Sequence, residues 1–171
     1  MDVFEAIATR RSIRRYTGEE VDDDEIGIMI KAGQDAPSAG NLQARDFIVI
    51  RDPSVKERLG DASLRQPQVY NADVVIGVCA NVPRSTIRYG SRGKLYSIQD
   101  ATASVQNMLL TAHALGLGCC WIGAFDDDEV SRILGLPEDV LPIALITVGR
   151  PAERPKKPPR FTTENVHWER W

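Results

Sequence analysis

Four arginines and a serine stand within six residues near the start of the chain, at positions 10–15. Guanidinium groups bind a phosphate dianion through paired, charge-assisted hydrogen bonds, and a serine hydroxyl can add another short one. This basic segment is therefore a candidate site for a phosphate-bearing ligand. A solvated helix end whose cations complement the helix dipole explains the same composition, and composition alone favours that simpler interpretation.

A second polar segment, at 36–43, follows an expected helix. Ser38, Asn41 and Gln43 offer donors and acceptors that can bind the edge of a planar heterocycle or a polyol. Gly40 lets the backbone come close to a ligand. An ordinary turn at a helix end, in which proline, serine, glycine and asparagine are all frequent, explains this segment equally well.

A third segment, at 115–125, is rich in glycine and small residues and lies between an expected helix and an expected strand. Such residues allow a flat ligand to approach the backbone. The glycines end a helix here, whereas a dinucleotide-binding fingerprint needs glycines that open a helix after a strand. His113 and His167 lack carboxylate or cysteine companions at ligand spacing, so the sequence predicts no metal site.

Apolar spacing and capping residues predict the elements that position these segments. Helices are expected over 2–9, 22–36, 52–59, 97–115 and 126–134, and buried strands over 47–50, 73–80, 119–122 and 143–148. The helix over 97–115 is mostly small or apolar, so we expect it to be buried on more than one side. Residues 62–71 are expected to be irregular and 84–94 to form a mobile loop. On its own, this order of elements indicates an α/β layout.

The length, net charge and composition of the chain exclude some classes of function. The chain of 171 residues has a single-domain length, and its net charge of −3 argues against nucleic acid as the main partner. The start lacks a signal-peptide pattern and no apolar run is long enough to cross a bilayer, so we expect a cytoplasmic protein without a membrane partner. Cys79, Cys119 and Cys120 fit small core residues in a reducing compartment; a redox dithiol is the alternative, although the C-x-x-C spacing is absent.

The composition changes after Gly149, where residues 151–160 are rich in proline and basic residues. Proline favours a semi-extended chain. We therefore expect one domain, 1–171, that ends in an extended arm, 151–171. Its tip carries His167 and three apolar residues, Val166, Trp168 and Trp171, too few to fold alone, and another protomer is a natural place for them to dock.

Four motifs, taken together and in order, resemble the nitroreductase family of flavin enzymes. They are Arg-Arg-Ser-Ile-Arg at 10–14, Ala-Pro-Ser-Ala-Gly-Asn-Leu-Gln at 36–43, Ala-Leu-Gly-Leu-Gly-Cys-Cys-Trp-Ile-Gly at 114–123, and Gly-Arg-Pro-Ala-Glu-x-Pro at 149–155. The resemblance covers nearly the whole chain. It implies an α+β fold, a three-layer α/β/α sandwich with a mainly antiparallel central sheet. It also implies an intertwined homodimer that exchanges the C-terminal arm and holds one FMN at each end of its interface.

The resemblance assigns cofactor-binding roles near the two ends of the chain. Arg10, Arg11 and Ser12 match positions that hold the FMN phosphate and ribityl chain. Arg14 matches a basic residue near the flavin N1 and O2 edge, where positive charge would stabilise the reduced, anionic ring. Arg160, in the arm, matches a phosphate-binding residue.

Further assignments concern the flavin ring and the second subunit. The backbone of Ile122 and Gly123 matches the stretch beside flavin N5. Gln68, with Gln66 and Gln99, is a less definite neighbour of the ring or the substrate. The positions that would reach the FMN of the partner subunit are Pro37, Ser38, Ala39, Asn41 and Gln43.

The reaction implied by the resemblance is a ping-pong hydride transfer from NADH or NADPH, through flavin N5, to a nitroaromatic, quinone or flavin acceptor. No side chain need act as a catalytic acid, because the cofactor carries the chemistry. Members that cleave reduced flavin or dehalogenate substrates with oxygen, and non-catalytic flavin-binding proteins, are the alternatives. The chain lacks the longer insertions that shape the substrate pocket in larger relatives, and residues 84–94 are expected to replace them as a lid.

Overall fold

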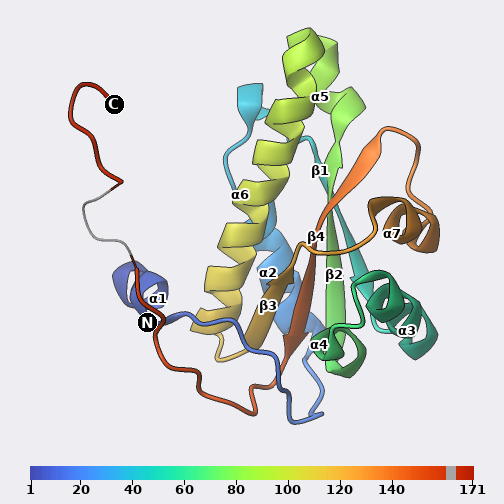
Figure 1. The fold of residues 1–171 in the computed structure, drawn as a ribbon, viewed down its shortest axis with the longest axis vertical. Helices are drawn as coiled ribbons and strands as arrows, with labels where there is room; N and C mark the ends of the chain where they lie inside the picture. The colour runs from blue at the N-terminus through green and yellow to red at the C-terminus, as the bar shows by residue number, and fades with distance from the viewer. Residues whose placement is uncertain (161–164) are drawn as a thin grey trace.

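Four antiparallel strands form the centre of the molecule, in the order β1–β2–β4–β3. Their bounds are β1 Arg45–Ile50, β2 Val74–Asn81, β3 Gly118–Ile122 and β4 Val140–Gly149. The computed structural model (Figure 1) describes residues 1–160 and 165–171. Because every ladder of this sheet is antiparallel, the α+β fold implied by the resemblance is confirmed, and the α/β layout suggested by element order alone is wrong.

Helices cover both faces of the sheet and complete a three-layer sandwich. On one face lie α2 (Asp23–Gln34) and the long α6 (Gly93–Ala114); on the other lie α3 (Pro53–Ala62), α4 (Pro67–Asn71) and α7 (Asp127–Leu134). The side-chain alternation of β2 divides the core: Val74 and Ile76 belong to the cluster beneath α6, whereas Val75 belongs to the cluster on the opposite face. As predicted, α6 is buried on more than one side, since both α2 and the sheet pack against it.

Aspartate caps fix the starts of four helices, as the sequence predicts. Asp2 accepts a hydrogen bond from the backbone N–H of Glu5 at the start of α1 (Val3–Thr9), and Asp126 does the same for Glu129 in α7. Asp52 precedes a proline at the first position of α3. Asp22 forms a reciprocal capping box at the start of α2.

The expected mobile loop at 84–94 is wrong, because this stretch is helical. It forms α5 (Val82–Tyr89), the short helix η2 (Gly90–Arg92) and the first turn of α6, which begins at Gly93 rather than near 97. Asn81 caps α5 by accepting from the N–H of Arg84. At Gly93 an added Cβ would lie 2.5 Å from Thr86 Cα, so α5 can pack against α6 only because this residue is glycine. Because this contact joins two helices, it cannot be recognised from the helix propensity of either one alone.

Two smaller expectations are also corrected. Residues 62–71, expected to be irregular, contain α4, whose proline stands in the first turn. The strand expected to be buried at 47–50 is the edge strand β1, and Val49 is 47% exposed there.

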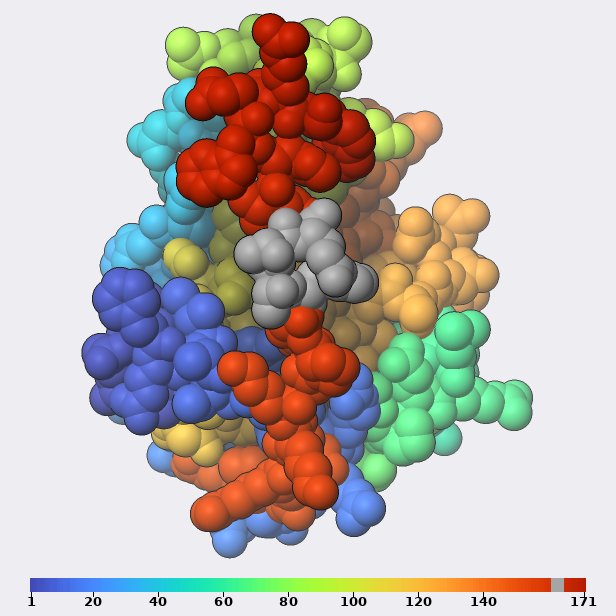
Figure 2. Space-filling model, turned by 60° about the vertical axis from the view of Figure 1, so that its left-hand side comes forward, coloured from blue at the N-terminus to red at the C-terminus, as the bar shows by residue number. Residues whose placement is uncertain are grey.

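The C-terminal arm leaves the sheet after β4 and runs along the surface next to α1. Figure 2 shows residues 151–160, in orange, beside the blue α1, with residues 165–171 above them. Trp168 and Trp171 are 85% and 101% exposed in the single chain. Their docking on another protomer stays a prediction. Within the described part of the chain, no helix is long and apolar enough to cross a membrane.

Candidate functional site

The basic segment at 10–15 lies in a loop that is pinned against β3. The N–H of Ile13 donates to the carbonyl of Cys119 at 2.9 Å, and the N–H of Thr17 donates to the carbonyl of Arg150 at 3.0 Å. Gly118 permits this close approach, since a Cβ there would lie 2.8 Å from Ile13 Cγ2. The loop is therefore fixed at both ends while its arginine side chains project from it.

These arginines line a cavity of about 320 Å³ together with the arm. The lining residues are Arg10, Arg11, Ser12, Arg14, Pro155, Lys156, Pro158 and Arg160. The structure thus brings Arg160 to the segment that begins 150 positions earlier, as the resemblance implies. The sequence reasoning did not identify Lys156 as a site residue; the basic composition of the arm was the one feature that pointed to it.

The charge of this cationic cavity is uncompensated. Five cations line it, and no carboxylate does. Over residues 1–160 and 165–171, none of these five side chains has a carboxylate oxygen within 4 Å. Like charges this close repel one another, so a bound anion would stabilise the cluster. Guanidinium forks and a hydroxyl are the donor set that suits a phosphate monoester, and the cavity therefore fits the phosphate end of FMN.

Glu153 fastens the arm to the arginine loop without neutralising the cavity. Its carboxylate accepts the backbone N–H groups of Arg14 and Arg15, at 2.6 and 3.2 Å. The side chain of Arg15 is the one that lies near it, with Nε 3.9 Å from Oε2. Arg14 is left with its guanidinium available to a ligand.

The expected ring-binding residues lie farther along the same strand. Cys120 of β3 is close enough to Ser12 and Arg14 for both to oppose the rise of its thiol pKa that burial causes. Ile122 ends β3, and the exposed Gly123 follows it. The β3 strand therefore leads from the cationic cavity to the backbone at 122–123.

Two glutamines border this end of β3. The side-chain amide of Gln66 donates to the carbonyl of Ala124 at 3.1 Å, and that of Gln68 donates to Gln66 Oε1 at 3.1 Å. Gln68 is buried, whereas Gln66 is half-buried. Both border the backbone at 123–124, whereas Gln99 lies in the first third of α6, toward the end of that helix far from α1; their proximity to the flavin ring or the substrate stays a prediction.

The segment at 37–43 is also at that far end of α6, away from the cationic cavity (Figure 1). Asp100, in the N-terminal half of α6, accepts the N–H of Ala39 at 3.0 Å. His113, near the other end, contacts Thr9 of α1 with 2.8 Å between Nε2 and Oγ1. Thirteen residues of helix separate these two contacts, about 20 Å along the axis. One chain therefore does not bring the two predicted halves of the site together.

Two buried charged residues that the sequence reasoning missed, Arg45 and Asp100, hold the segment at 37–43 through hydrogen bonds to its backbone. The guanidinium of Arg45, 4% exposed, donates to the carbonyls of Gln34, Ala36 and Pro37 at 2.6, 2.7 and 3.2 Å. Asp100, also 4% exposed, accepts a second N–H, from Ala44, at 3.3 Å. Burial lowers the pKa of Arg45, and the charge of Asp100 opposes that change. The sequence did contain one signal for this arrangement: Asp100 is the one carboxylate in α6, a helix whose other residues are mostly small or apolar.

The backbone inside this segment is strained. Asn41 and Gln43 have φ values of 55° and 50°, a region that side-chain-bearing residues rarely adopt. Such residues cost on the order of 1–3 kcal/mol each and persist where the surroundings hold them. Here the backbone is held by Arg45 and Asp100, and by a hydrogen bond of 2.7 Å that Arg84 donates to the carbonyl of Gln43. This rigidity favours a preorganised binding segment over an ordinary turn.

The cysteines do not form a redox pair. Cys119 and Cys120 are adjacent in β3, so their side chains point to opposite faces and enter different core clusters. Burial raises the pKa of Cys119 to about 12, and the pKa of Cys79 likewise to about 12. The interpretation as core residues is therefore confirmed by their burial.

We expect the folded protein to react with the thiol reagent DTNB at well under one thiol per chain at about pH 8, because the thiolate is the reactive form and burial disfavours it. The same titration in guanidinium chloride should detect all three cysteines. Rapid reaction of even one thiol in the folded state would contradict this account.

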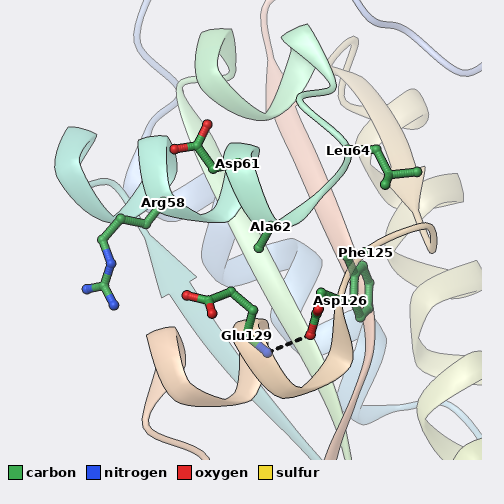
Figure 3. Close-up of a pocket in the computed structure, with 7 residues that line it drawn as sticks. All are labelled: Arg58, Asp61, Ala62, Leu64, Phe125, Asp126 and Glu129. Carbon is green, nitrogen blue, oxygen red and sulfur yellow. Dashed lines mark hydrogen bonds between the residues drawn. The ribbon is translucent and has the colours of Figure 1, made fainter.

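A larger hollow, of about 620 Å³, lies between α3 and α7 and is lined by Arg58, Asp61, Ala62, Leu64, Phe125, Asp126 and Glu129 (Figure 3). Its carboxylates are largely engaged: Asp126 caps α7, and Asp61 accepts from the hydroxyl of Tyr70 at 2.9 Å. The cationic cavity, whose five cations have no carboxylate partner among the described residues, is therefore the better candidate for a ligand-binding site. No group of three potential metal ligands occurs within the described residues.

Comparisons with known proteins agree with this geometry. The family model described as "Nitroreductase family" matches residues 7–73 and 62–150. A protein of Methanothermobacter thermautotrophicus, provisionally named NADH dehydrogenase/NAD(P)H nitroreductase, is 35% identical over 100% of this chain and 88% of its own. FMN reductase (NADPH) of Bacillus subtilis is 30% identical over 98% of this chain and 73% of its own.

A solved structure gives the same result for the fold. The NADPH:FMN oxidoreductase of Vibrio harveyi, complexed with NAD+, superposes with a TM-score of 0.91 at 28% identity. The match covers 98% of this chain and 77% of that one.

Proposed function

The chain belongs to the nitroreductase family, and on that premise we propose that it is an FMN-dependent oxidoreductase that uses NADH or NADPH to reduce a nitroaromatic, a quinone or a free flavin. The observation that carries this proposal is the cationic cavity, in which residues from both ends of the chain gather five cations that, within the described residues, have no carboxylate partner and suit a phosphate. The names of its relatives, FMN reductase and NAD(P)H nitroreductase, support the flavin and the donor.

Each part of the site has one task in this proposal. Arg10, Arg11, Ser12 and Arg160 bind the FMN phosphate and ribityl chain. Arg14 places positive charge at the N1 and O2 edge, where it stabilises negative charge that develops on reduction. The backbone at 122–123 would lie beside N5 of a bound flavin and could offer it an N–H.

The cofactor, when bound, supplies the chemistry by accepting a hydride at N5 from the pyridine nucleotide and giving it to the acceptor. The residues of this chain bind, orient and stabilise charge, and none acts as an obligatory proton donor. Donor and acceptor use the same space in turn, which is the basis of a ping-pong sequence.

The proposal includes a homodimer. The segment at 37–43 lies about 20 Å along α6 from the contact that anchors α1, a separation that favours its contributing to the flavin site of another protomer. The exposed tryptophans of the arm offer the partner an apolar contact, consistent with exchange of the arm.

The direct test is anaerobic mixing of the FMN-loaded protein with NADH and with NADPH, followed by absorbance. Bleaching of the flavin spectrum by one donor, and recovery on adding a quinone, is the expected result. A protein that binds FMN but is bleached by neither donor would be a flavin-binding protein without this activity.

Replacing Arg14 by alanine should raise the FMN dissociation constant about tenfold and slow flavin reduction about tenfold, because one charge-assisted interaction near the ring is lost. Arg14→Lys, which keeps the charge, should restore part of the reduction rate. An Arg14→Ala protein with unchanged flavin spectrum and unchanged reduction rate would refute the role given to this residue.

A further inference from the structure

A basic cap covers the end of α6 opposite the cationic cavity. We define this cap as residues 82–96, which comprise α5, η2 and the first turn of α6 (Figure 1). It contains Arg84, Arg88, Arg92 and Lys94 and no aspartate or glutamate. In a chain of net charge −3, a stretch whose charged residues are all positive is a local feature that requires an explanation.

Only one of these cations is used by the fold. Arg84 pairs with Asp46 at 3.0 Å and also donates to the carbonyls of Gln43 and Arg45. Arg88, Arg92 and Lys94 are exposed, and within the described residues none of the three has a carboxylate oxygen within 4 Å. Three cations therefore remain available to an anion.

Two tyrosines order the free guanidiniums. Arg88 lies over the ring of Tyr89, with 5.6 Å between Cζ and the ring centroid, and Arg92 lies 5.1 Å from the ring of Tyr96. Nε of Arg92 also donates to the hydroxyl of Tyr96 at 2.9 Å. The two rings meet edge to face, 4.9 Å apart. Cation–π contacts of this kind restrict the side chains and lower the entropy cost of binding.

The cap is in direct contact with the segment at 37–43. At Gly40 an added Cβ would lie 2.5 Å from the hydroxyl oxygen of Tyr89 and 2.9 Å from Nη1 of Arg88. Arg84 joins the cap to the same segment through the carbonyl of Gln43. Any flavin that residues 37–43 contact would therefore also have the cap beside it.

We propose that the cap binds the phosphate groups of substrates that enter the flavin site to which residues 37–43 contribute. The inference rests on the proposed function and extends it to substrate recognition. A pyridine nucleotide donor must bring its nicotinamide to the flavin, so its phosphates must lie toward the mouth of the site; a free FMN acceptor has the same requirement. The phosphate of the resident cofactor is bound elsewhere, in the cationic cavity.

The test compares substrates with and without phosphate on the FMN-loaded enzyme. In the double variant Arg88→Gln/Arg92→Gln, kcat/KM for NADPH should fall about tenfold through a higher KM, while N-benzyl dihydronicotinamide, a donor without phosphate, should change less than about twofold. The acceptors FMN and riboflavin form a second such pair. The loss with a phosphate-bearing substrate should also shrink as salt is raised, because exposed charges are screened.

Arg132→Gln is the matched control. It makes the same change at an exposed arginine of α7, whose side chain pairs with Glu129 on the surface, and the rates with all four substrates should stay unchanged. A selective loss in either pair supports the inference and identifies the substrate concerned. Equal losses with and without phosphate, or no loss in either pair, overturn it. Failure of the proposed function itself would be seen in the unmodified protein, as absence of FMN binding or of reduction by either donor.

Discussion

Replacing Arg10 and Arg160 together by glutamine is expected to weaken FMN binding at least about 100-fold, while riboflavin binding changes little. Each guanidinium offers a charge-assisted contact worth on the order of 1.5–3 kcal/mol, and tenfold in affinity corresponds to about 1.4 kcal/mol. The two residues lie at opposite ends of the chain yet line one cavity. Riboflavin lacks the phosphate and so does not report on these contacts.

Titration of the apoprotein with each flavin, followed by flavin fluorescence, measures both constants. Each single variant should show part of the loss, and the double lysine variant should keep the charge but recover only part of the affinity, since lysine does not form the bidentate fork. If the affinities for FMN and for riboflavin fell by the same factor, these residues would be supporting the fold and not binding phosphate.

The parts of the site that the sequence could predict are those whose chemistry is local. Residues 10–14 and 36–43 concentrate unusual side chains in short stretches, and both lie in fixed loops at surface positions. The position of Arg160 beside Arg10 could be anticipated only from the family resemblance, because the basic, proline-rich composition of the arm does not indicate that it returns to residue 10. Proximity in space between such distant segments is decided by tertiary packing.

The fold was predicted well where a single element carries its own signal. Asp2, Asp22, Asp52 and Asp126 mark helix starts within a residue of their observed positions. The sheet's strand pairing was not readable from element order, since helices between strands suit parallel and antiparallel sheets alike. The helix α5 was missed because its packing against α6 at Gly93 is a contact between segments, and a short polar stretch followed by glycines resembles a loop.

The buried pair of Arg45 and Asp100 illustrates the limit most clearly. Arg45 begins an otherwise ordinary strand, Asp100 is the one carboxylate of α6, and 55 positions separate them. Their significance comes from the five backbone groups that they bind together around residues 34–44. Neither local propensity nor motif spacing contains that information.

Replacing Arg45 by methionine is expected to lower the free energy of unfolding by about 3–5 kcal/mol, because the buried carboxylate of Asp100 loses the positive charge near it. Three carbonyls also lose their donor. Urea unfolding followed by circular dichroism measures the change. Asp100→Leu alone should be similarly destabilising, because the N–H groups of Ala39 and Ala44 lose their acceptor and the buried guanidinium of Arg45 loses the negative charge near it.

The double variant Arg45→Met/Asp100→Leu separates stability from function. Because it removes both charges, it should be more stable than the sum of the single losses predicts, with a coupling free energy of about 1–3 kcal/mol. Its FMN affinity should nevertheless stay at least about tenfold below that of the unmodified protein. The strained backbone at Asn41 and Gln43 relaxes once the carbonyls and N–H groups around it lose their partners, and the binding geometry relaxes with it. A double variant that regains both stability and full FMN affinity would show that the pair serves the fold alone and that the segment at 37–43 is an ordinary turn.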